Sequence, residues 1–110
     1  MKFILISRHT NGAEIPENEG EQNLEEMGEW IALLNPTLAM PIRGGAIVTA
    51  SRVEQYRGDI GGAIVYEADD LDHTVALAKR SPGLKHGFTH EVFPEISISQ
   101  AAHEKVSDQA

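Results

Sequence analysis

The sequence contains no cysteine among its 110 residues. This absence excludes a disulfide framework, a thiolate zinc site and a cysteine nucleophile. It is compatible with a reducing compartment, and we expect a cytoplasmic protein.

Basic residues are scarce, with nine Lys and Arg against 17 Asp and Glu and a formal charge of −8. Such a chain repels a phosphate backbone and an anionic bilayer, so we expect no nucleic-acid partner and no membrane partner. Long apolar runs are also missing. The amino terminus "MKFILISRHT" is too short in apolar residues for a signal core or a spanning helix, and we expect no export signal.

Several motifs of catalysis and cofactor binding are missing. "RGGAIV" and "IGGAIV" lead into strands instead of opening a helix, so neither is a phosphate loop. No G-x-S-x-G nucleophile elbow occurs. His86 and His90 are spaced to share one strand face, but no third ligand accompanies them. We therefore expect no cofactor and no bound metal.

The length indicates one domain, which we place at residues 1–98, followed by a polar tail at 99–110. "KFILISR" predicts a first strand, and residues 9–22 a long exposed loop. A helix is predicted from a cap at Asn23 to Asn35, with an apolar face of Leu24, Met27, Ile31 and Leu34.

Two more strands are predicted at 44–53 and 59–68, paired as a hairpin. A second helix follows from a cap at Asp70 to Pro82, with an apolar stripe of Leu71, Val75 and Ala78. Residues 86–98 supply a fourth extended segment, in which Pro94 favours a bend or an edge position. The cluster Asp69, Asp70 and Asp72 is interpreted as a helix start, because a cap and a dipole partner need only these positions.

The order strand, helix, strand, strand, helix, strand predicts an α+β, ferredoxin-like fold. Two right-handed crossovers then build an antiparallel four-stranded sheet with both helices on one face. The other face stays bare and apolar. A second copy of the chain is the simplest cover, so we expect a homodimer.

The chain resembles the YCII-related group, including its DGPF branch, in the dimeric α+β barrel superfamily. "MKFILISR", "MGEWIALL" and above all "GGAIVYEADDLDHTVALAKRSPG" followed by "HEVFP" carry the resemblance. It implies the same fold and a dimer. Many members are thought to use a His on the first helix and an Asp before the second-helix proline. Those positions hold Met27 and Ser81 here, and the "DGPF" sequence itself is replaced by "RGDIGG".

Candidate ligand-binding residues are His9, Arg52, His90, His86 and Trp30. His9 ends the first strand, and Arg52 offers a cation near the end of the predicted second strand. Each has an ordinary alternative as a solvated or packed side chain. We expect a small anionic or aromatic ligand near the dimer seam. The alternatives are a cofactor-independent enzyme with His9 or His90 as base, acting by elimination, isomerisation or oxygenation, and a purely structural role.

Overall fold

The computed structural model describes residues 1–10 and 14–103. Its strands are β1 (Lys2–His9), β2 (Leu38–Pro41), β3 (Ala46–Val48), β4 (Val53–Gln55), β5 (Ile60–Glu67) and β6 (Phe88–Pro94). Its helices are η1 (Glu17–Glu19), α1 (Gly20–Leu34), α2 (Leu71–Ala78), η2 (Pro82–His86) and α3 (Ile98–Ala102), where η marks a 3₁₀ helix. None of these helices is both long and apolar enough to cross a bilayer.

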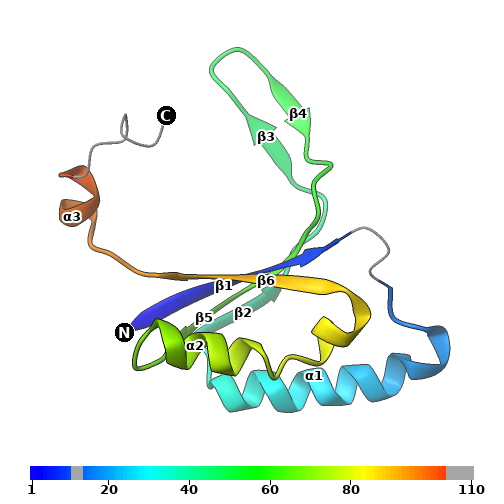
Figure 1. The fold of residues 1–110 in the computed structure, drawn as a ribbon. Coiled ribbons are helices and arrows are strands. Elements are labelled where there is room, and N and C mark those ends of the chain that lie inside the picture. The colour runs from blue at the N-terminus through cyan, green and yellow to red at the C-terminus, as the bar shows by residue number, and fades with distance from the viewer. Residues whose placement is uncertain (11–13, 104–110) are drawn as a thin grey trace.

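Four strands form one antiparallel sheet in the order β2-β5-β1-β6. Figure 1 shows α1 and α2 together on one face of this sheet. The order and the two crossovers confirm the ferredoxin-like α+β fold. β1 lies inside the sheet. β6 lies at its edge, one of the two outcomes predicted from Pro94, and ends at that residue.

The helix-facing side of the sheet carries the core. Phe3 and Leu5 of β1 and Tyr66 of β5 are fully buried, and Trp30 and Leu34 of α1 are 4% exposed. These side chains alternate with outward-facing ones because successive strand residues point to opposite faces. The core therefore lies between the sheet and α1, with α2 contributing Leu77 and Ala78.

The opposite side of the sheet has an apolar row that crosses all four strands. Leu38 lies opposite Val65, Val65 opposite Ile4, and Ile4 opposite Phe93. Met40, Ala63 and Ile6 form a second row beside it. We call these seven residues the outer band.

Ion pairs border the outer band at both ends of the strands. At one end Lys2 pairs with Glu95, and the amino terminus pairs with Glu67. At the other end Arg8 bonds Asp59 and Glu91, each at 2.7 Å. An apolar centre with a charged border is the usual anatomy of a protein interface.

The predicted second strand at 44–53 is wrong. The sheet strand beside β5 is the shorter β2, which follows the α1 C-cap Asn35 in the left-handed conformation. Residues 44–53 instead contribute β3 and the turn of a separate β3–β4 hairpin, which we call the arm. The composition "GGAIV" favours extended backbone, but tertiary contacts decide which strand this segment pairs with.

The predicted start and face of the first helix also need correction. α1 begins at Gly20, so Asn23 lies inside the helix and is buried, whereas Leu24 is 73% exposed. Met27, Ile31 and Leu34 pack toward the core as predicted. The helix begins three residues before the predicted cap, and in this longer helix the Asn23 side chain lies on the buried face.

Asp70 is the N-cap of α2, as predicted, and its carboxylate accepts a hydrogen bond from the His73 amide at 2.8 Å. The apolar stripe is displaced: Leu71 is 51% exposed, whereas Thr74 is fully buried. The Thr74 hydroxyl reaches the Tyr66 hydroxyl, so a polar pair inside the core sets the rotation of this helix. α2 ends at Ala78, and Pro82 starts η2.

Candidate functional site

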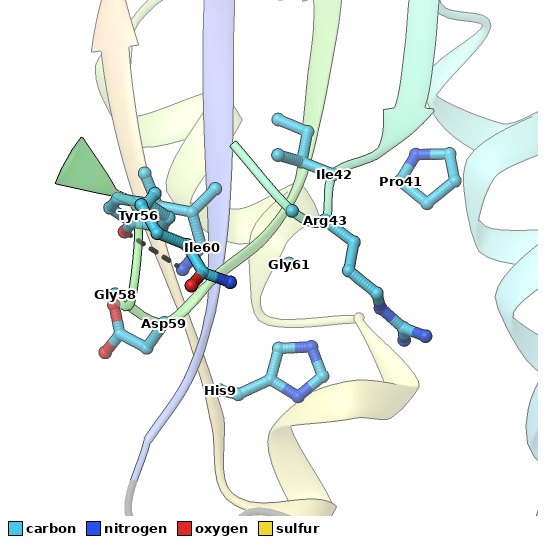
Figure 2. Close-up of a pocket in the computed structure, with 11 residues that line it drawn as sticks. His9, Pro41, Ile42, Arg43, Tyr56, Gly58, Asp59, Ile60 and Gly61 are labelled. Carbon is cyan, nitrogen blue, oxygen red and sulfur yellow. Dashed lines mark hydrogen bonds between the residues drawn. The ribbon is translucent and has the colours of Figure 1, made fainter. Parts of the chain in front are cut away.

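A large hollow lies where the arm leaves the sheet, and we call it the arm-base pocket. Its volume is about 930 Å³. Figure 2 shows its walls, which come from the end of β1, the segment after β2 and the segment before β5. It is lined by His9, Pro41, Ile42, Arg43, Gly44, Gln55, Tyr56, Gly58, Asp59, Ile60 and Gly61.

Arg43 dominates the electrostatics of this pocket. The lining carboxylate of Asp59 is already bonded to the Arg8 guanidinium, and that bond lowers the pKa of Asp59. No carboxylate within residues 1–10 and 14–103 lies at ion-pair distance from Arg43. The lining thus presents one uncompensated positive charge, which favours an anionic ligand.

The His9 imidazole stands beside this charge. Its ring meets the Phe88 ring edge-on, with centroids 4.5 Å apart. Gly61 of β5 lets the ring approach, because a Cβ at this position would lie 2.3 Å from His9 Nε2. Figure 2 shows the His9 ring and the Arg43 guanidinium extending toward the same side of the pocket. A glycine and an aromatic ring thus hold His9 in place.

A second group of candidates meets on the helix side of the sheet. His90 Nε2 lies 2.7 Å from the Ser81 hydroxyl oxygen, and the His90 ring stacks on Trp30 with centroids 5.5 Å apart. The Trp30 indole donates to the Leu77 carbonyl at 2.9 Å. Burial lowers the pKa of His90, so the ring is held neutral. We call His90, Ser81 and Trp30 the His90 cluster.

The five predicted ligand residues therefore do not share one site. His90 and Trp30 are in contact, and His9 lines the arm-base pocket. Arg52 lies in the turn of the arm, where it pairs with Glu54 at 3.0 Å, so it does not reach His9's pocket.

His86 lies in η2, so the predicted strand face shared with His90 is wrong. Its Nε2 is buried, and so is Asn23 Oδ1; neither has a hydrogen-bond partner in the described part of the chain. Within that same part no group of three His, Cys, Asp or Glu side chains could hold a metal ion.

Two pocket residues escaped the sequence analysis, Arg43 and Tyr56. The Tyr56 hydroxyl accepts a hydrogen bond from the Ile60 amide at 3.4 Å, which ties the arm to the start of β5. The available signal was weak, namely an arginine and an aromatic residue on either side of a Gly-bounded hairpin. Only the fold brings both stems of that hairpin to His9.

A family model, the YCII-related domain, matches residues 1–95. The chain belongs to the YCII-related family. Of the two positions implied by the resemblance, Met27 packs against the core, and Ser81 is buried and bonded to His90. This member therefore has a serine at the second position, in contact with a histidine on β6.

A solved structure shares the fold. It is the 5-chloro-2-hydroxyhydroquinone dehydrochlorinase of Burkholderia phenoliruptrix AC1100, in complex with 2,5-dihydroxybenzoquinone. The match covers 91% of this chain and 98% of that one, with a TM-score of 0.61 and 15% identity. At this identity the likeness shows the fold alone. A comparison with curated proteins gives no match.

Proposed function

We propose that this protein is a homodimer that binds a small, flat, anionic molecule in the arm-base pocket. The observation that carries the proposal is Arg43, an uncompensated cation beside His9 in a large hollow. A guanidinium can bond an anionic oxygen in a bidentate manner. Ile42, Ile60 and the Tyr56 ring add apolar surface that suits the faces of a flat ring. We also propose a cytoplasmic location, because a chain without cysteine is compatible with a reducing compartment.

The structural neighbour supports the ligand class. It was solved with 2,5-dihydroxybenzoquinone, an acidic and flat molecule. An oxygenated ring of this kind has acidic oxygens for Arg43 and a hydrogen-bond partner for His9. The dimer is supported by the outer band, in which Leu38, Met40 and Phe93 remain 47%, 45% and 49% exposed.

The test is titration calorimetry of the full chain with 2,5-dihydroxybenzoquinone, with hydroquinone as a neutral probe. Arg43→Gln is expected to weaken binding of the acidic probe about tenfold or more, the usual effect of losing a charge-assisted hydrogen bond. Arg57→Gln is the matched control, because Arg57 is an exposed arginine on the other stem of the arm and does not line the pocket. Equal effects of the two variants, or equal affinity for both probes, would contradict the proposal.

A second candidate function is a cofactor-independent elimination in the same pocket, with His9 as the base. Its support is the open imidazole of His9, held against Phe88, together with the dehydrochlorinase activity named for the neighbour. In such a step the imidazole takes a proton from the substrate, a double bond forms, and chloride leaves with its electron pair.

A chlorinated hydroxyhydroquinone tests this reaction, with chloride release as the readout. His9→Gln is expected to abolish release while binding of 2,5-dihydroxybenzoquinone persists. His73→Gln is the control, because His73 is an exposed histidine at the α2 N-terminus. Chloride release that survives in His9→Gln removes His9 as the base, and absence of release in the wild type leaves the binding function alone.

A further inference from the structure

The arm has almost no support from the rest of the chain that the structure describes. Within residues 1–10 and 14–103, β3 and β4 pair only with each other, and every residue of both strands is exposed. Ile47 is 43% exposed, Val48 74% and Val53 68%. An isolated two-stranded hairpin is marginally stable in water, so the arm needs a surface to pack on.

The arm stands on the side of the sheet that carries the outer band. Figure 1 shows α1 and α2 on one side and the arm rising on the other, near the carboxyl end of β1. α3 rises on the same side at the opposite end of the sheet, and its Ile98 is 90% exposed. A body seated on the outer band is therefore bounded by the arm and by α3.

The charges favour a second copy of this chain as that body. The arm and its two stems, residues 43–57, hold three arginines and one glutamate, a formal charge of +2 within a chain of −8. The remaining residues therefore carry −8 − 2, or −10. Arg52 and Glu54 pair within the arm, so the excess positive charge lies at Arg43 and Arg57 in the stems. A basic segment at the base of the arm, on an otherwise acidic chain, is attracted to another copy of that chain. The acids at the border of the outer band are already paired within the protomer, so they do not oppose the approach.

We infer that the arm is a clasp, in which Val48 and Val53 pack against Ile98 of the partner subunit. Val48 and Val53 are paired across the arm and share one face. If the two copies pack face to face with strands reversed, the arm end of one sheet lies over the α3 end of the other. A two-fold relation then forms the contact twice. This inference rests on the dimer of the proposed function. It adds the contact between the arm and the partner's α3 that holds the two subunits together.

The absence of native cysteine allows a direct test by cross-linking. Val48→Cys and Ile98→Cys proteins are mixed and treated with a mild oxidant or a short bis-maleimide. The expected product is a covalent dimer that contains one chain of each variant. Leu24→Cys replaces Ile98→Cys in the control, because Leu24 is a highly exposed apolar residue on the helix side.

Each result has one meaning. Cross-linking of Val48→Cys to itself instead of to Ile98→Cys overturns the arm-to-α3 contact. A stable dimer without any cross-link at Val48 overturns the clasp but leaves the proposed dimer in place.

A charge on the arm supplies an independent measurement. Val48→Glu is expected to raise the dimer dissociation constant at least tenfold by sedimentation equilibrium, and Leu24→Glu to leave it unchanged. Equal dissociation constants for the two variants contradict the clasp. A wild-type protein that sediments as a single subunit at micromolar concentration contradicts both the clasp and the proposed dimer, whereas ligand binding at Arg43 is judged separately by calorimetry.

Discussion

On the helix side of the sheet, Phe3, Leu5 and Tyr66 are fully buried, whereas Leu38, Met40 and Phe93 on the other side keep almost half of their surface exposed. The same strands supply both sets, through the same alternation of side chains. The difference is the cover. α1 and α2 cover one side, and on the other side the arm and α3 are the only described elements that rise from the sheet (Figure 1).

This comparison separates two sources of stability. Burial against α1 belongs to the folded subunit and does not depend on protein concentration. Burial of the outer band requires a second body, so its contribution follows mass action. Neighbouring residues on β1 can therefore differ in the kind of stability that they supply.

The largest expected effect is a loss of stability from a substitution in the core on the helix side. Leu5→Ala should lower the free energy of unfolding by about 2–5 kcal/mol, because it leaves a cavity in a fully buried site. The loss should be the same at low and high protein concentration in urea denaturation.

Ile4→Ala is the matched variant on the outer band, one residue away. Its loss should be smaller in dilute protein and should grow as the concentration rises, because Ile4 is only partly buried in the subunit. Concentration-independent losses for both variants would show that the outer band is not covered by a second copy.

A smaller effect, the dependence of stability on pH, tests the helix side of the sheet. Burial on the helix side lowers the pKa of His90 below its unfolded value near 6.5. The unfolded chain therefore binds the proton first as pH falls, and stability is lost from about pH 6.5 downward through the folded pKa. Stability that rests on neutral His90 is complete at higher pH.

His90→Gln should reduce the loss of stability between pH 7 and pH 5, by at most about 1.4 kcal/mol per pH unit. Thermal unfolding across this range measures the change. His103→Gln serves as control, because His103 is exposed near the end of α3. An unchanged pH dependence in His90→Gln would mean that another group accounts for the acid sensitivity.

Much of the fold could be predicted from local patterns. The apolar run at Lys2–Arg8, the Asp70 cap and the end of the first helix at Asn35 all rest on interactions within a few residues, and the structure confirms them. The second strand could not be predicted in this way. Residues 44–53 and Leu38–Pro41 both have strand-like composition, and pairing with β5 chose the shorter one.

The candidate site was less predictable than the fold. His90 and Trp30 lie 60 positions apart, and only the fold brings the Trp30 ring of α1 onto the His90 ring of β6. Arg43 and Tyr56 are unremarkable in the sequence, and they line a pocket with His9 because both stems of the arm return to the end of β1. Arg52 was a reasonable candidate by type, but the turn of the arm carries it away from that pocket.

By itself, the sequence determined the local and the global quantities: the charge, the lack of thiols, the order of strands and helices, and two chemically similar sheet faces. These follow from composition and from the period of two along a strand. Only the tertiary structure decided which face the helices cover, which segment pairs with β5, and which side chains meet at the arm. Those choices depend on contacts between residues far apart in the chain, where no local pattern carries the information.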